Sequence, residues 1–185
     1  MNDKKLQELA ALIAKRNAIS TEIARIIGRP AFDGHIAAYI ASEVFAIDLH
    51  VSAANKGFDG HFREGKLVGR SVNVKWRGKA DRTLNLSPEP SSSDFYLVFA
   101  GPAGPPGSSR GQDRPWEIEK VYCFEAAVLL GQLSKRGVKI GTAGSVADEF
   151  WRGAEIFPDA RANCLMLSDA QRNALSWFAI RNGGV

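Results

Sequence analysis

The chain has 185 residues, of which 45% are hydrophobic and 24% are charged. This length and composition are typical of one globular domain with its own hydrophobic core, and they exclude a mainly disordered, collagen-like or coiled-coil protein. No stretch reaches the ~18 consecutive apolar residues of a membrane-spanning helix. The first residues are charged where a secretory signal would be apolar, so we expect a cytoplasmic protein with no membrane segment.

The formal net charge of +4 is concentrated in one segment of the chain. Residues 56–82 contain eight basic and three acidic residues, which is a net charge of +5. The remaining residues contain 16 basic and 17 acidic residues, which is a net charge of −1. A local excess of positive charge suits the phosphate backbone of a nucleic acid. The sequence therefore indicates a near-neutral domain with one basic segment.

Hydrophobic periodicity predicts three helices in the first part of the chain. Apolar residues recur at helical spacing over residues 4–16. A short second helix is predicted over residues 20–27, ended by Gly28 and Pro30. Residues 35–47 are predicted to form the third helix.

The pattern then changes to the alternation that is typical of strands. Residues 57–62 and 70–77 both alternate, and the short charged turn between them predicts an antiparallel hairpin. Residues 94–100 are almost continuously apolar, which indicates a central strand buried on both faces. The polar or Gly/Pro-rich segments 78–93 and 101–115 are predicted to be loops.

The last third of the chain mixes strands and helices. We expect a strand over 116–123, a helix over 124–136, a short strand over 138–141, and helices over 145–156 and 168–180. This order predicts an α/β fold, with a central mixed β-sheet flanked by helices in a single domain. The domain would comprise N-terminal helices, a core and C-terminal helices, at residues 1–34, 35–142 and 145–185.

The two cysteines, Cys123 and Cys164, lie 41 residues apart in apolar segments. This spacing matches neither a paired-cysteine zinc site nor a disulfide framework. We therefore expect both to be small, buried core residues.

Glu43 is a carboxylate in an apolar part of its predicted helix. The residues three and four positions away on either side are apolar or aromatic. Such a carboxylate is costly to bury unless it is paired or bound to a metal. The alternative is that Glu43 lies at the edge of the apolar face and reaches water.

A second group of polar residues lies on the predicted hairpin. Asp59 stands between Gly57 and Gly60 in the first strand, and small neighbours let a ligand approach the backbone closely. Asn73 and Lys75 share one face of the partner strand, beside which Asp59 can lie. Carboxylate and amide oxygens suit Mg²⁺, and an ammonium can stabilise charge on a reacting phosphate. The alternative is a solvated strand face with local hydrogen bonds.

The order of these residues resembles the PD-(D/E)XK nuclease superfamily, which has the restriction-endonuclease-like fold. That pattern is a helix that often carries a Glu, then a strand with an Asp, then a strand with (D/E)-x-K. Glu43, Asp59 and Lys75 occupy these places in this order. Asn73 stands where the family has an acidic residue, and Phe58 stands where it has a Pro.

The resemblance implies an endonuclease that uses Mg²⁺ or Mn²⁺ to hydrolyse DNA phosphodiester bonds. Asp59, Glu43 and Asn73 would hold the metal, and Lys75 would complete the catalytic set. The basic residues expected to bind the nucleic acid are Lys56, Arg70, Arg77, Lys79, Arg110 and Arg114. Double-strand cutters of this superfamily usually dimerise, so the resemblance also allows a homodimer.

Two other functions stay open at this point. Asn73 brings no negative charge, which weakens metal binding and allows a catalytically inactive nucleic-acid-binding module on the same fold. The basic hairpin would also suit a protein-interaction scaffold with an acidic partner. Convergence of Glu43, Asp59, Asn73 and Lys75 on one cleft would favour the nuclease, whereas a Glu43 that faces away from Asp59 would favour the scaffold.

Overall fold

The computed structural model describes residues 3–50, 57–78, 83–86, 93–102, 115–141, 144–159 and 163–179. The helices in these ranges are α1 (Asp3–Ile27), α2 (Asp33–Phe45), α3 (Ala126–Lys135), α4 (Asp148–Ala154) and α5 (Asp169–Ser176), with one 3₁₀ turn at Gly65–Leu67. The strands are β1 (Ile47–Leu49), β2 (Gly60–Phe62), β3 (Ser71–Arg77), β4 (Thr83–Leu84), β5 (Phe95–Ala100), β6 (Lys120–Glu125), β7 (Gly144–Ser145) and β8 (Glu155–Phe157).

Six strands form a central mixed sheet in the order β1-β2-β3-β5-β6-β8. Strands β3 and β5 run parallel, and the other neighbouring pairs are antiparallel. The predicted hairpin is confirmed, because β2 pairs with β3 through Gly60 opposite Val72 and His61 opposite Ser71. The α/β class with a central mixed sheet is therefore confirmed. Strands β4 and β7 pair separately in a small second sheet.

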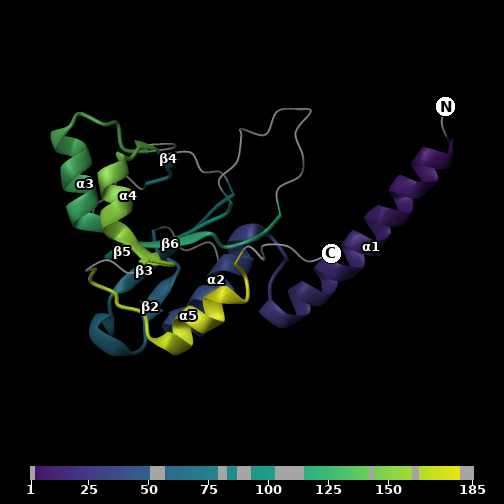
Figure 1. The fold of residues 1–185 in the computed structure, drawn as a ribbon, viewed down its shortest axis with the longest axis horizontal. Helices are drawn as coiled ribbons and strands as arrows, with labels where there is room; N and C mark the ends of the chain where they lie inside the picture. Colours follow the sequence, from purple (N-terminus) through teal and green to yellow (C-terminus); the bar gives the residue numbers. More distant parts are fainter. Residues whose placement is uncertain are drawn as a thin grey trace.

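Helices cover both faces of the central sheet, with α2 and α5 on one face and α3 and α4 on the other (Figure 1). The side chains of β5 alternate between these two layers. Phe95, Leu97 and Phe99 pack towards α2, whereas Tyr96 and Val98 pack towards α3 and α4. Every residue of β5 is buried, which confirms the predicted central strand.

The prediction of two N-terminal helices is wrong, because α1 runs without a break over 25 residues. The segment between the two predicted helices holds neither Gly nor Pro, so nothing there ends the helix. Thr21 follows the helical pattern and donates its hydroxyl to the carbonyl of Asn17. The predicted stop is confirmed at Gly28, which has a φ of +68°.

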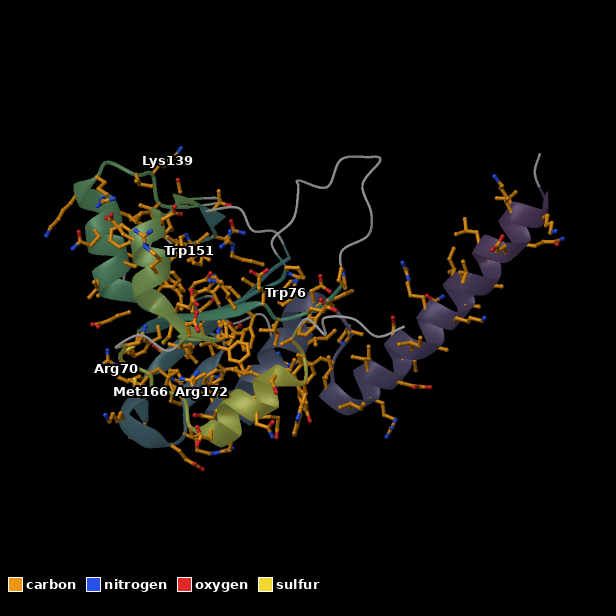
Figure 2. All side chains as sticks on the ribbon, viewed as in Figure 1. Arg70, Trp76, Lys139, Trp151, Met166 and Arg172 are labelled. Atoms are coloured by element: carbon orange, nitrogen blue, oxygen red, sulfur yellow. The ribbon has the colours of Figure 1, made fainter. Side chains whose placement is uncertain are left out.

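Helix α1 stands apart from the body of the molecule. Figure 1 shows it projecting from the helical layer next to α2, and Figure 2 shows its side chains clear of the sheet and its covering helices. Residues 4–19 are all exposed, and contact with the body begins near Ser20. None of the helices in the described ranges combines the length and apolarity that a membrane crossing requires.

The C-terminal third differs most from the prediction. The segment predicted as one helix over 145–156 contains the end of β7, then α4 and the start of β8. Strand β8 is fully buried and extends the sheet by pairing with β6. The segment 138–141 is not a strand. The predicted capping box of α5 is confirmed, with reciprocal hydrogen bonds between Ser168 and Gln171.

Candidate functional site

Asp59 lies immediately before β2, where the hairpin ladder ends. Its backbone N–H donates to the carbonyl of Val72 at 2.8 Å. Its side-chain Oδ2 accepts from the backbone N–H of Val74 at 2.7 Å. The carboxylate thus replaces the main-chain acceptor that a longer β2 would offer to β3, and it is held against that strand.

Asn73 and Lys75 lie on the face of β3 that points away from α2. Val72 and Val74 alternate with them and pack towards α2. Asn73 donates from Nδ2 to the carbonyl of Gly57 at 3.0 Å. The Nζ of Lys75 lies 5.3 Å from the centre of a ring on the next strand, that of Tyr96. The structure therefore brings Asp59, Asn73 and Lys75 together at the N-terminal end of β2.

The two charged groups at this point are half-buried and affect each other. Burial raises the pKa of Asp59 above its ordinary value of 3.8, and this outweighs the N–H of Val74 and the positive charge of Lys75, which both lower it. Burial likewise lowers the pKa of Lys75 from its ordinary value of 10.5, against the opposing attraction of Asp59. Each group therefore stabilises the charged form of the other in partly desolvated surroundings.

Two further residues that sequence reasoning missed lie near Asp59. Arg29 and His50 both lower the pKa of Asp59 through their charge, although less than Lys75 does. The guanidinium of Arg29 donates to the carbonyl of His50, and the backbone N–H of His50 donates to the carbonyl of Asp59 at 2.8 Å. Arg29 precedes α2 and His50 follows β1, so no local motif could have placed them here.

A cluster of rings borders the same end of β2. The ring centres of His50 and Phe58 are 4.9 Å apart, and those of Phe58 and His61 are also 4.9 Å apart. The Nε2 of His50 is buried and has no hydrogen-bond partner among the described residues. A buried polar atom of this kind usually finds a partner, so His50 can hydrogen-bond a ligand at this edge.

Glu43 does not join this group. It is exposed on α2, which covers the opposite face of the sheet from Lys75. Glu43 borders an apolar groove of about 420 Å³ between α2 and α5, together with Tyr39, Ala174 and Trp177. Glu43 therefore lies at the edge of the apolar face of its helix and reaches water, as the alternative interpretation predicted.

The oxygen ligands at this edge are few. Among the described residues, no group of three or more His, Cys, Asp and Glu side chains could hold a metal ion. Of the described residues that form this edge, Asp59 offers a carboxylate and Asn73 an amide oxygen. Mg²⁺ keeps several of its waters and commonly binds one or two carboxylates plus phosphate oxygens. Asp59 and Asn73 could therefore supply at most two of the ligands of such an ion, and water and a bound phosphate would have to supply the others.

The predicted nucleic-acid contacts divide into three groups. Arg77 shares the face of Lys75, with its guanidinium 4.3 Å from the ring centre of Trp151. Arg70 forms an ion pair with Asp94 at 2.8 Å and stays half-exposed. The other four predicted contacts lie outside the described residues, at Lys56, Lys79, Arg110 and Arg114.

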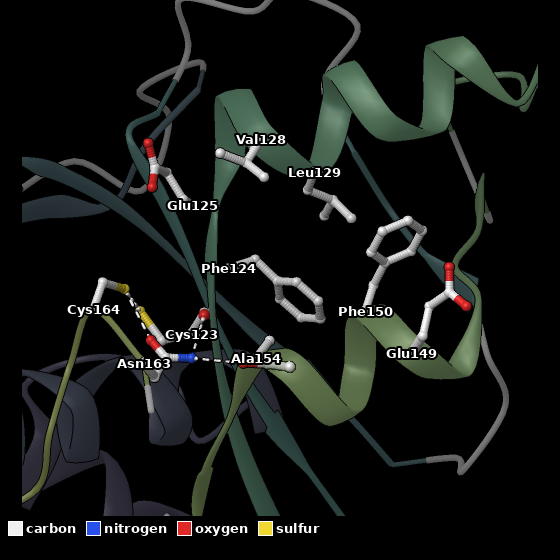
Figure 3. A pocket seen from close by; sticks show the side chains of 11 residues that line it. Cys123, Phe124, Glu125, Val128, Leu129, Glu149, Phe150, Ala154, Asn163 and Cys164 are labelled. Atoms are coloured by element: carbon white, nitrogen blue, oxygen red, sulfur yellow. Dashed lines mark hydrogen bonds between the residues drawn. The ribbon is translucent and has the colours of Figure 1, made fainter. Parts of the chain in front are cut away.

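A separate pocket of about 310 Å³ lies between β6, α3 and α4 (Figure 3). The thiol sulfurs of Cys123 and Cys164 are 3.9 Å apart at its edge, where Asn163 donates to the carbonyl of Cys123. Cys123 is buried as predicted, but the same prediction for Cys164 is wrong. Cys164 is exposed because it lies in an irregular segment between β8 and α5. None of the residues predicted to form the functional site lines this pocket.

Comparison with known proteins adds no assignment to this geometry. No protein-family model matches the chain, and no curated protein matches it.

Proposed function

We propose that the protein is a metal-dependent nuclease-like enzyme that binds DNA at the N-terminal end of β2 and hydrolyses phosphodiester bonds there. The observation that carries this proposal is the half-buried pair of Asp59, which is held against β3 by the N–H of Val74, and Lys75 on β3, where each charge affects the pKa of the other. Partly buried, mutually perturbed charges of this kind are concentrated at functional sites. The pair also lies within the basic segment 56–82, which suits an anionic substrate.

The residues present have distinct roles in this proposal. Asp59 and the amide oxygen of Asn73 would hold Mg²⁺ or Mn²⁺ together with a phosphate of the substrate. When bound, such a cation polarises the phosphodiester and lowers the pKa of a coordinated water. Lys75 lies beside Asp59 and would stabilise the negative charge that develops on the phosphate oxygens. Glu43 has no role in this mechanism, because it lies on the other side of the sheet.

Lys75 and Arg77 have different tasks because they differ in position. Lys75 lies next to the carboxylate, whereas Arg77 lies two residues further along the same face. Arg77 would therefore hold the neighbouring part of the DNA backbone rather than the reacting phosphate. Its guanidinium suits phosphate, because it is planar and presents several N–H donors.

A cleavage assay with matched variants tests the enzyme proposal. Purified protein is incubated with labelled single- and double-stranded DNA in the presence of Mg²⁺ or Mn²⁺. Lys75→Ala and Asp59→Asn should each lower the cleavage rate by about 100-fold or more, as expected for groups that act on the reacting bond. Lys66→Ala is the control, because Lys66 belongs to the same basic segment but is exposed on the 3₁₀ turn.

Equal cleavage by the wild type and the Lys75→Ala variant would remove Lys75 from the mechanism. An equal loss in the Lys66→Ala variant would show that total charge, and not this pair, matters. Circular dichroism of each variant separates loss of activity from loss of fold.

A second candidate function is binding of nucleic acid without cleavage. The specific observation is that the single carboxylate of Asp59 is surrounded by the charges of Lys75, Arg29 and His50. Such a site can hold a phosphate without a metal. This function predicts affinity that falls with salt by a slope of about −0.9 per phosphate contacted, no cleavage, and binding that survives Asp59→Asn. A salt slope near zero would contradict both the enzyme and the binding module.

The position of Glu43 agrees with the third possibility, the interaction scaffold. That function predicts no metal binding at Asp59. Calorimetry with Mn²⁺ distinguishes it: heat of binding in the wild type that disappears in Asp59→Ala contradicts a pure scaffold. Absence of any such heat, together with a flat salt dependence of DNA binding, would support it.

A further inference from the structure

Helix α1 exposes a stripe of large apolar side chains that nothing in the described structure covers. Their exposed fractions are 51% for Leu6, 53% for Leu9, 55% for Leu12, 43% for Ile13, 58% for Ile19 and 59% for Ile26. The helix projects from the body over most of its length (Figure 1). A helix in water is normally stabilised by packing of its apolar face against a partner. We therefore expect a partner to cover the exposed stripe.

The spacing of the residues along this side of α1 indicates the kind of partner that would cover it. Steps alternate between three and four residues along one seam, which consists of Leu9, Leu12, Arg16, Ile19, Ile23 and Ile26. A 3-4 alternation is the pattern of a helix that packs along another helix with coiled-coil geometry. Arg16 is the one polar member, and its apolar stem can lie along the seam while its charge reaches water.

The charges beside the seam select a second copy of α1 in the antiparallel direction. In that direction Leu9 packs against Ile26 of the second copy, Leu12 against Ile23, and Arg16 against Ile19. Lys15 then lies opposite Glu22 of the second copy, and the two-fold axis generates the same ion pair twice. Leu6 meets Ile27 of the second copy, so that apolar contact continues beyond the seam.

The parallel direction lacks these contacts. It would place Lys15 beside Ser20 and Glu22 beside Ile27 of the second copy, so neither charge finds an opposite charge. It would also bring both bodies to the same end, because the rest of the chain follows Ile27. The antiparallel direction places the two bodies at opposite ends of the helix pair.

We propose that two copies of this chain form a homodimer through antiparallel pairing of α1, with Lys15–Glu22 ion pairs flanking an apolar seam. This dimer is independent of the function proposed for Asp59 and Lys75. At the base of α1, Ile23 and Ile27 are half-buried, and the part of each side chain that stays exposed is available to the second copy.

Sedimentation velocity of the full chain over a range of concentrations tests the dimer. The wild type should shift from monomer to dimer as concentration rises. Leu12→Glu should abolish the shift, because it places a charge in the seam. Ala14→Glu is the matched control, since Ala14 lies outside the seam on the same exposed part of the helix, and it should leave the dimer intact. A wild type that stays monomeric, or a Leu12→Glu variant that still dimerises, would overturn the proposal.

Charge reversal tests the antiparallel direction. Lys15→Glu alone and Glu22→Lys alone each put like charges opposite one another twice, and each should weaken the dimer about tenfold. An equal mixture of the two single variants should restore dimers of one copy of each, since both cross-helix pairs then become attractive. Leu12 is unchanged in both variants, so the apolar seam is constant. If the mixture associates no better than the separate variants, this register is wrong.

Discussion

Asp59 combines a structural and a chemical property in one side chain. Its Oδ2 accepts from the N–H of Val74 and so extends the hairpin hydrogen bonding beyond the N-terminal end of β2. Replacement by Ala would leave that N–H without its acceptor, at a cost of about 1–3 kcal/mol if it stays buried. Replacement by Asn retains an oxygen acceptor and removes only the charge. Asp59→Asn therefore separates the electrostatic role of this residue from its part in the hairpin.

The charge of Asp59 predicts a specific pH dependence of stability. Its folded-state pKa is raised above 3.8, so the folded protein binds the proton more tightly than the unfolded chain. The resulting stabilisation, relative to Asp59→Asn, is complete below the unfolded pKa and is lost as the pH rises through the folded pKa. Urea unfolding of both proteins from about pH 3 to about pH 7 should show this decline. A difference that stays constant, or that grows with pH, would contradict the raised pKa.

At the scale of elements, the edge formed by β1, β2 and β3 depends on one close approach. A Cβ on Gly60 would lie 2.2 Å from the backbone carbonyl oxygen of Asp48. Gly60 also pairs with Val72 and directly follows Asp59. The absence of a side chain at this position therefore allows β1 to lie against β2 and keeps the carboxylate in place.

Gly60→Ala should destabilise the protein by about 1–3 kcal/mol, because β1 and β2 must separate to admit the methyl group. Gly131→Ala is the matched control. Gly131 lies in α3, and a Cβ added there would meet none of the described residues within 4 Å, so alanine should stabilise that helix by about 0.5–1 kcal/mol. Thermal unfolding of both variants measures the contrast. A Gly60→Ala protein as stable as the wild type would show that β1 can move away without cost.

At the scale of the whole molecule, the buried strand β5 joins the two layers of the core. Leu97 belongs to the layer beneath α2 and α5, and Val98 belongs to the layer beneath α3 and α4. Both side chains are fully buried. The two layers therefore share one strand, and we expect them to unfold together.

Leu97→Ala should lower the free energy of unfolding by about 2–5 kcal/mol, since it leaves a cavity at a fully buried position. The midpoint should fall equally when unfolding is followed by tryptophan fluorescence and by circular dichroism, because one transition involves both layers. Val128→Ala is the control, as Val128 is 56% exposed on α3. Two separate transitions in the Leu97→Ala protein would show that the layers unfold independently.

Elements with a strong local pattern could be predicted from sequence. Strand alternation and a short connection predicted the β2–β3 hairpin, continuous apolar character predicted β5, and the pair of Ser168 and Gln171 predicted the start of α5. Strands β1 and β8 could not be predicted in this way. Each has three residues, and each is stabilised by pairing with a strand that no short turn joins to it: β1 pairs with β2, and β8 pairs with β6.

The residues of the candidate site likewise fall into those that the sequence could predict and those that it could not. Asp59 directly precedes β2, and Asn73 and Lys75 lie on its hairpin partner β3, so the proximity of the three follows from the hairpin alone. Arg29 and His50 reach the site only through contacts outside the hairpin: the guanidinium of Arg29 donates to the carbonyl of His50, and the N–H of His50 donates to the carbonyl of Asp59. The position of Glu43 is also a tertiary result, because the sequence did not specify which face of the sheet α2 covers.

The sequence by itself determined the α/β class, the basic hairpin and the grouping of Asp59 with Asn73 and Lys75, since these depend on composition and on contacts between near neighbours in the chain. Only the tertiary structure decided that Glu43 lies away from them, that Arg29 and His50 lie beside them, and that α1 leaves an apolar stripe in solvent. The physical reason is that side-chain alternation and turns act locally, whereas the packing of helices on a sheet depends on the whole core.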